Sequence, residues 1–410
     1  MPEILITVVY FSIYIGLIAT TFYILSFIAE KKKKKLLYED HELPKVTVII
    51  PAYNEEKTIS KTLNSILDSD YPDFEVIFVD DGSMDKTLQV AKKFKKVRIF
   101  HKENGGKGSA LNLGISKARG EIIFTMDADT TVDPQSMKNM VRLFKDKSVM
   151  SVTPAMIIDN PKTVLQKVQH VEYLLGLFLR KAFASVRSIF VAPGAFSAYR
   201  KEFFDKYGGY DVGNVTEDLE IALRIQFKGF HTENCPEAPA YTIAPSKFKD
   251  LLIQRRRWYF GLIKNLWNYR KIISPKYGDL GVFVIPVAMI SIFLAVFVTV
   301  YLLFKTLFSI RKDLLFLQSI NFDFANAFDL NFYIVERFLF SYISNPILIF
   351  VLIFVGILSF YMFYASRKIG KLSGIIFNII LFFLFFSILF GFWWIVSIFY
   401  VIFNKKIKWK

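Results

Sequence analysis

Spaced carboxylates, one lysine and a short arginine run are the parts of this sequence that could do chemistry. Asp127 and Asp129 stand two residues apart, and carboxylate oxygens at that spacing suit Mg²⁺ or Mn²⁺ together with a diphosphate. Lys107 lies among glycines, where a backbone can approach a nucleotide closely and an ammonium can pair with its phosphates. Three arginines within Gln254–Trp258, beside a hydrophobic block, imply a bound anion. These groups suit nucleotide-dependent transfer.

Two further acidic pairs could act on the same ligand. Asp80 or Asp81 could accept a hydrogen bond from the N–H of a nucleotide base. Thr216 is placed as the N-cap of a helix that opens with Glu217 and Asp218. Acidic capping alone explains that pattern, and the alternative is that one carboxylate acts as a general base.

The arginine run also has a simple explanation without catalysis. Basic residues just cytoplasmic of a membrane segment commonly bind anionic lipid headgroups. The five residues alone favour neither interpretation, so the decision depends on the rest of the chain.

The elements that must position these groups form an α/β pattern between residues 44 and 245. Four apolar runs are expected to be buried strands, and amphipathic helical spacing separates them: Val46–Ile50, Phe74–Val79, Val97–Phe100 and Ile122–Met126. Each is followed by a polar motif, respectively Pro51–Glu56, Asp80–Ser83, Asn104–Gly108 and Asp127–Asp129. A mostly parallel sheet would bring such motifs into one crevice at its carboxyl edge.

Composition places part of the chain in a membrane. Hydrophobic residues make up 53% of the 410 residues, which indicates a soluble domain joined to membrane spans. Ile4–Ala29 is long enough to cross a bilayer, and its positive charges follow it, at Lys31–Lys35, as in an uncleaved anchor with its N-terminus outside. Juxtamembrane lysines explain the net charge of +16 better than nucleic-acid binding does.

The later hydrophobic runs predict four or five spans in all. Leu280–Phe304, Pro346–Tyr364 and Ser373–Phe403 are the candidates. If the last crosses once, the C-terminal lysines lie outside, against the charge rule, so it is expected to be one tilted span or a short hairpin. Phe332–Tyr342 is left as an interfacial helix or a further span.

The expected domains follow from these patterns. They are an anchor over residues 1–30, a cytoplasmic α/β domain over 44–245, an interfacial helix over 246–275 and a membrane region over 280–410. Val164–Phe183 is either a second interfacial helix or an ordinary amphipathic helix packed on the sheet. The single cysteine, Cys235, excludes an intrachain disulfide, and four scattered histidines show no zinc-site spacing.

Taken together, the ordered motifs and the flanking spans resemble the processive family 2 glycosyltransferases with a GT-A domain. This group includes the cellulose, chitin, hyaluronan and poly-N-acetylglucosamine synthases. The resemblance covers about residues 44 to 270, and the motif Gln-x-x-Arg-Trp at Gln254–Trp258 is typical of processive members. It implies an inverting transferase that uses a UDP-sugar, with UDP-N-acetylglucosamine favoured ahead of UDP-glucose.

The resemblance also implies roles for matching residues. Nucleotide-sugar binding falls to Pro51, Ala52, Tyr53, Glu55, Asp80, Asp81, Lys107, Asp127, Gln254, Arg255 and Arg257. A Mg²⁺ or Mn²⁺ ion would lie at Asp127 and Asp129, and Asp218, with Glu217 beside it, would supply the catalytic base. The acceptor would meet Trp258, Gly194 and Thr216.

Competing functions remain open at this stage. A non-processive transferase that adds one sugar to a lipid-linked acceptor would share the nucleotide half of the site. A transporter with a non-catalytic nucleotide-binding domain fits less well, because the predicted spans carry no charged residue for an ion pathway. We expect a multi-pass plasma-membrane protein with a cytoplasmic catalytic domain, a polysaccharide or lipid-linked acceptor, contact with the lipid bilayer, and any activator to be an accessory subunit or the lipid.

Overall fold

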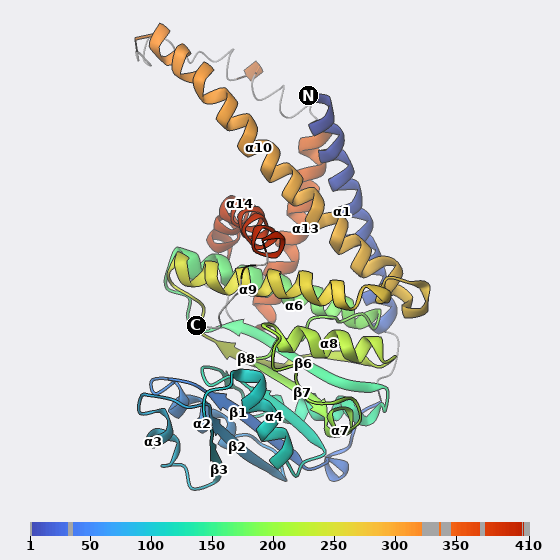
Figure 1. Ribbon diagram of the computed structural model, residues 1–410. Coiled ribbons are helices and arrows are strands. Elements are labelled where there is room, and N and C mark those ends of the chain that lie inside the picture. Colours follow the sequence, from blue (N-terminus) through green and yellow to red (C-terminus); the bar gives the residue numbers. More distant parts are fainter. Residues whose placement is uncertain are drawn as a thin grey trace.

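The protein has an α/β domain at one end and long apolar helices at the other (Figure 1). The computed structural model describes residues 2–31, 36–321, 336–337, 346–369, 374–403 and 405. Two long helices, α6 (Val164–Ser185) and α9 (Phe248–Asn268), lie between these ends (Figure 1). The α/β domain therefore faces the apolar helices through a layer of helix.

An eight-stranded sheet forms the centre of the α/β domain, in the order β3-β2-β1-β4-β7-β6-β8-β5 among the described residues. Its strands are β1 (Val46–Ala52), β2 (Phe74–Asp80), β3 (Val97–His101), β4 (Ile122–Met126), β5 (Thr131–Val132), β6 (Val149–Ile158), β7 (Phe196–Arg200) and β8 (His231–Thr242). The first four strands are mutually parallel. β7 pairs antiparallel with β4 and β6, β5 pairs antiparallel with β8, and β6 and β8 are parallel. The predicted mostly parallel sheet is confirmed, with its antiparallel pairs confined to the second half.

Helices cover both faces of the sheet, because the strands alternate apolar side chains to both sides. Val48 and Ile50 belong to a core with α2, whereas Ile49 and Ile77 belong to a second core with α4. The surrounding helices are α2 (Ile59–Leu67), α3 (Thr87–Ala91), α4 (Lys107–Lys117), α5 (Ser136–Arg142), α7 (Lys201–Tyr207) and α8 (Glu217–Phe227). The four predicted strands all exist, within two residues of the expected ends.

Four apolar helices make up the other end: α1 (Pro2–Lys31), α10 (Ile285–Ser319), α13 (Pro346–Ile369) and α14 (Ile375–Ile402). Within the residues that the structure describes, three segments are long and apolar enough to cross a membrane, namely Ile6–Ser26, Leu280–Ser319 and Leu348–Arg367. A fourth, α14, qualifies only as a bent pair, because Ile375–Phe386 and Leu389–Ile402 meet at 41°. The three earlier predicted spans therefore correspond to helices.

Several expectations fall outside the described residues. These are the lysines 32–35, nearly all of Phe332–Tyr342 and the lysines at 406, 408 and 410. The open question about Val164–Phe183 has a clear answer, because α6 packs on β6 and β8 and also contacts α1, α13 and α14. It is both a helix on the sheet and part of the layer against the apolar helices.

Candidate functional site

Parallel strand register brings the first motifs together. Ala52 of β1 pairs with Asp80 at the end of β2, and Asp80 pairs in turn with His101 of β3. Asp127 follows β4 directly, and its backbone N–H donates to the carbonyl of Ala195 at 2.9 Å. The carboxyl edge of the sheet thus gathers residues from the parallel half and from the loop before β7, as the sequence predicted.

Lys107 lies at the centre of this edge. It begins α4, and the preceding Gly106 has φ of 85°, a conformation that glycine adopts without steric cost. The Lys107 Nζ lies 2.6 Å from Asp127 Oδ1 and 3.4 Å from Glu217 Oε1. Burial alone would lower the pKa of Lys107, but the carboxylates of Asp127, Glu217 and Asp218 outweigh it and raise that pKa. Lys107 therefore stays charged and joins the predicted metal pair to the predicted base.

Asp218 lies beside Lys107 against the loop that contains Gly194. The Gly194 N–H donates to Asp218 Oδ2 at 2.9 Å. A Cβ on residue 194 would come within 2.9 Å of both that oxygen and Lys107 Nζ, so only glycine fits here without displacement. Asp218 is partly exposed, whereas Glu217 is 3% exposed. Of the two carboxylates, Asp218 is the one placed to meet a ligand.

Burial gives Glu217 a different pKa from that of a glutamate on the surface. Burial and the neighbouring Asp218 raise the pKa of Glu217, while Lys107 and Arg257 lower it. Glu217 is thus a buried partner of Lys107, which also pairs with Asp127. The geometry gives it a positioning part in the site.

Asp129 fits a cation site. Burial, followed by the carboxylates of Asp127 and Glu55, raises the pKa of Asp129 to about 7, because like charges crowd one another. Within the described ranges no group of three or more His, Cys, Asp or Glu residues could hold a metal unaided. Two hard carboxylates that share a single lysine suit a divalent ion that takes its remaining ligands from water and phosphate.

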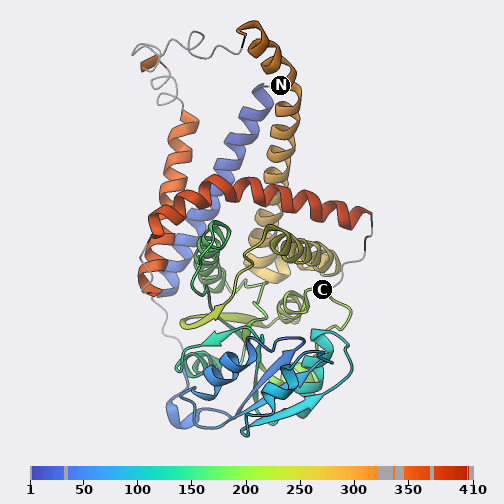
Figure 2. The same ribbon diagram turned by 90° about the vertical axis from the view of Figure 1, so that its left-hand side faces the viewer.

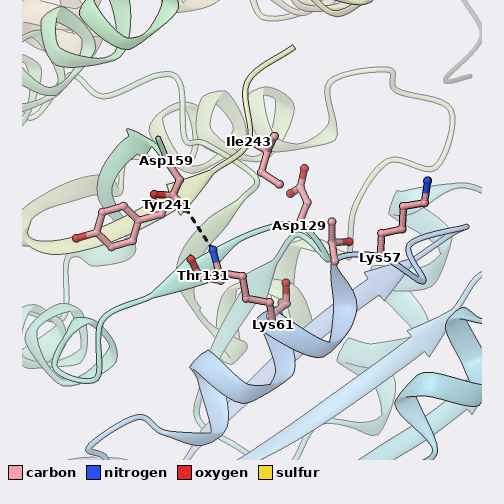
Figure 3. Close-up of a pocket in the computed structure, with 9 residues that line it drawn as sticks. Lys57, Lys61, Asp129, Thr131, Asp159, Tyr241 and Ile243 are labelled. Atoms are coloured by element: carbon pink, nitrogen blue, oxygen red, sulfur yellow. Dashed lines mark hydrogen bonds and ion pairs between the residues drawn. The ribbon is translucent and has the colours of Figure 1, made fainter. Parts of the chain in front are cut away.

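A small pocket adjoins Asp129 on the side of α2 (Figure 3). Lys57, Lys61 and Asp159 contribute to its lining, and Lys61 Nζ lies 3.2 Å from Asp159 Oδ2. Asp129 is the member of the acidic pair that lines this pocket. The pocket marks the outer edge of the site.

The two carboxylates predicted to meet the base have different environments. Asp81 accepts from the N–H groups of Gly105 and Gly106 and lies 2.8 Å from Lys102 Nζ, so it holds the glycine loop before α4. Asp80 is fully buried and its Oδ2 lies 2.6 Å from His101 Nδ1. The other oxygen, Asp80 Oδ1, has no hydrogen-bond partner within the described ranges. Asp80 therefore retains the free acceptor.

The first motif lines the same edge. Pro51 and Ala52 are buried at the end of β1, and Tyr53 is exposed at 36%. Glu55 donates its N–H to Thr87 Oγ1 at 2.7 Å, and its carboxylate accepts from Thr58 at 2.8 Å. Of these four predicted residues, Tyr53 and Glu55 have side chains that are at least partly exposed and could contact a ligand. Pro51 and Ala52 are buried and form the end of the strand.

Thr216 is packed beneath α9 and forms the N-cap position of α8 as predicted. It is 4% exposed, and Asn265 of α9 donates to its hydroxyl at 3.0 Å. A Cβ on Gly261 would come within 2.1 Å of that hydroxyl oxygen, so the glycine allows the close approach. This burial argues against the predicted acceptor contact, and we assign Thr216 to positioning Glu217 and Asp218.

Arg255 has its anion within the protein. It is 2% exposed, and its Nη2 lies 2.7 Å from Glu172 Oε2 on α6. The guanidinium also lies over the rings of Trp258 and Trp393, at 4.3 and 5.6 Å from their centroids. Burial raises the pKa of Glu172, and Arg255 opposes that shift. Arg255 is thus paired within the protein, and its expected contact with a diphosphate stays a prediction.

The rest of the arginine motif divides between the site and the apolar helices. Arg257 lies near enough to Glu217 to lower its pKa. Arg256 instead donates to the Tyr400 hydroxyl of α14 at 2.8 Å. Gln254 Oε1 is buried with no partner among described residues, and Trp258 is partly buried beside Arg255. Among these residues Arg257 is the one whose charge reaches the carboxylates of the site.

Sequence reasoning missed four supporting residues: His101, Glu172, Asn265 and Trp393. Glu172 had a signal, because it is the one acidic residue in the apolar helix α6, and a lone buried acid requires a partner. No comparable signal in the sequence pointed to the other three residues, because each of them contacts a residue from another element of the fold.

Known proteins match this chain in both sequence and fold. The model of the glycosyl transferase family 2 matches residues 47–208. A poly-beta-1,6-N-acetyl-D-glucosamine synthase of Staphylococcus epidermidis is 27% identical over 76% of this chain and 78% of its own. Its counterpart in Staphylococcus aureus (strain COL) is 31% identical over 62% of this chain and 63% of its own.

A solved structure shares the architecture. A mannosyltransferase from Pyrobaculum calidifontis, in complex with GDP-Man and Mn²⁺, aligns with a TM-score of 0.58 over 97% of this chain and all of that one, at 18% identity. At that identity the match supports the fold alone. The family match assigns residues 47–208 to the glycosyl transferase family 2, so the chain carries a family 2 glycosyltransferase domain, joined to apolar helices long enough to span a membrane.

Proposed function

We propose that this protein is an inverting synthase that transfers a sugar from a UDP-sugar to a growing β-linked polysaccharide. The observation that carries the proposal is the meeting of Asp127, Lys107 and Asp218 at one edge of the sheet, directly beneath α9. UDP-N-acetylglucosamine is the favoured donor, followed by UDP-glucose. The synthase relatives support this choice of donor and product.

Asp218 is the proposed base. Its Oδ2 accepts from the Gly194 N–H and its Oδ1 from the Leu219 N–H, which orients the carboxylate while leaving lone pairs for an acceptor hydroxyl. The hydroxyl loses its proton to Asp218 as its oxygen attacks the anomeric carbon. In-line attack inverts that carbon, so an α-linked donor gives a β-linked product.

The departing UDP carries the charge that the reaction releases. Arg257 would stabilise it from α9, and Lys107 would neutralise the carboxylates nearby. Asp127 and Asp129 would hold a Mg²⁺ or Mn²⁺ ion, which supplies charge stabilisation to the diphosphate when bound. Asp80 would lie beneath the base, and its buried Oδ1, which has no described partner, would accept an N–H of the base once the residues that cover it move.

The long apolar helices give the product a route. A polysaccharide cannot cross hydrocarbon unaided, because its hydroxyls would lose their hydrogen bonds to water. α6 and α9 lie between the site and α1, α10 and α13 (Figure 1), so a chain extended at Asp218 is next to them. We propose a cytoplasmic site, a plasma-membrane location and transfer of the product past Trp258.

The decisive experiment supplies purified protein with a panel of UDP-sugars and Mn²⁺ and measures both UDP and product size. Continuous UDP release with size-graded polymer is expected from one donor, and EDTA should stop it until Mn²⁺ or Mg²⁺ is restored. A single lipid-linked product would replace the proposal with one-step transfer. Absence of UDP release from every donor would overturn the enzymatic assignment.

A further inference from the structure

Helix α14 runs in a different direction from the other apolar helices. Figure 2 shows it crossing α1, α10 and α13, which run together away from the α/β domain. It packs on both α6 and α9, the two helices that cover the site. A helix in that direction does not share the path of the three candidate spans.

Both faces of α14 are apolar, yet only one is covered. Ile379, Phe382 and Trp393 are buried against the helices below. The opposite face exposes a row of large apolar side chains: Ile376, Phe377, Ile380, Leu384, Phe385, Phe399 and Ile402. An exposed apolar surface of this extent requires an apolar partner, and the adjoining candidate spans α10 and α13 place that surface at hydrocarbon level.

We infer that α14 lies in the plane of the membrane, with its exposed row in the lipid of the leaflet nearest the catalytic domain, and does not cross. Three spans would then return the chain to the catalytic side. Lys405, which follows α14, would then lie on the catalytic side, as the charge rule requires. This removes the conflict that a crossing Ser373–Phe403 created.

The covered face of α14 also contacts the arginine motif of α9. What we infer from these contacts rests on the proposed function. Trp393 lies over the guanidinium of Arg255, and the Tyr400 hydroxyl accepts from Arg256. These contacts set the rotation of α9 about its axis, and thereby the direction of Arg257. Trp393 is a positioning residue, through which a helix seated in lipid orients the group that meets the diphosphate.

Topology can be tested without activity, because the chain has one cysteine, Cys235, and it is buried. In a Cys235→Ser background, Lys410→Cys is compared with Lys96→Cys on the α/β domain and Gln318→Cys at the far end of α10. Spheroplasts are treated with a membrane-impermeant maleimide before and after lysis. Lys410→Cys should behave like Lys96→Cys, and behaviour like Gln318→Cys would overturn the inference.

The same labels separate this inference from the proposed function. Labelling of Lys96→Cys in intact spheroplasts would reverse the proposed cytoplasmic orientation, while α14 would still be judged by whether residues 410 and 96 agree. Ile380→Cys addresses the exposed row, which should be accessible to a lipid-soluble maleimide. Oxidative crosslinking of Ile380→Cys between two copies would assign that row to a second copy and overturn the lipid contact.

The positioning role has its own test. Trp393→Leu should lower kcat for UDP release about tenfold, as expected for loss of a desolvated cation–π contact, and Trp393→Phe should restore most of it. Phe385→Leu, on the exposed row, is the matched control and should keep parental kcat. All three variants should elute from a size-exclusion column at the same volume as the parent protein, which shows that they are folded. Equal kcat for Trp393→Leu and Phe385→Leu would overturn the role.

Discussion

Two clusters of buried charge lie on either side of α9, and they are balanced differently. At the sheet edge, Lys107 meets the carboxylates of Asp127, Glu217 and Asp218, so negative charge is in excess. Between α6, α9 and α14, one arginine meets one carboxylate, and two indole rings lie near that arginine. The first cluster needs a cationic or proton-donating ligand, whereas the second is complete within the protein.

The difference teaches which charged residues are available for chemistry. A charged side chain that is already paired within the protein stabilises the packing of helices. A charged side chain without a balancing partner is available to bind a ligand. Arg255 and Arg257 are two residues apart in one motif, yet the fold assigns one to each cluster. Spacing in the motif could not have distinguished them.

The largest expected effect comes from removing the base in the unbalanced cluster. Asp218→Asn has nearly the same shape and keeps one of the two backbone hydrogen bonds through its amide oxygen, but it cannot take a proton, so turnover should fall by about 10² to 10⁴-fold. UDP binding, measured by calorimetry, should persist. Asp205→Asn on exposed α7 is the control, and turnover near the parental rate in Asp218→Asn would remove the base assignment.

A second substitution tests the space beside that carboxylate. Gly194→Ala places a methyl group 2.9 Å from Asp218 Oδ2 and from Lys107 Nζ, so we expect a loss of kcat of about tenfold or more from misplaced groups. Gly213→Ala, whose Cβ would come no nearer than 3.7 Å to Asp211, should have little effect. If the two variants matched in kcat, close packing at residue 194 would not matter for the reaction.

The balanced cluster should respond as a structural pair does. Glu172→Ala leaves Arg255 buried without its anion, which costs about 3 to 5 kcal/mol, and the melting temperature in detergent should fall. Replacing both residues, as Glu172→Leu with Arg255→Met, should recover most of that loss because no unpaired charge remains. A double variant as unstable as the single one would show that the pair contributes more than mutual neutralisation.

An exposed ion pair at the rim should matter least. Lys61 and Asp159 lie 3.2 Å apart, and the Lys61 side chain is 70% exposed, so solvent screens their attraction. Lys61→Ala should change stability by less than about 1 kcal/mol, within the scatter of melting measurements. A drop as large as that of Glu172→Ala would erase the contrast between buried and exposed pairs.

Much of the catalytic half was predictable because its information is local. Strand β4 and the acidic pair after it are contiguous, and parallel register places consecutive strand ends at one edge. The long apolar helices were predictable for the same reason, because the length of an apolar run can be counted directly in the sequence. The residues that support the site were harder, since His101 meets Asp80 and Asn265 meets Thr216 only after the chain folds.

The sequence by itself determined the α/β domain, the order of its motifs and the presence of long apolar helices, because apolar periodicity and strand-end chemistry depend on neighbouring residues. Only the tertiary structure decided which arginine pairs with Glu172, which carboxylate of Glu217 and Asp218 stays accessible, and which way α14 runs. Burial and charge pairing depend on side chains brought together from distant helices, and that information exists only in the packed molecule.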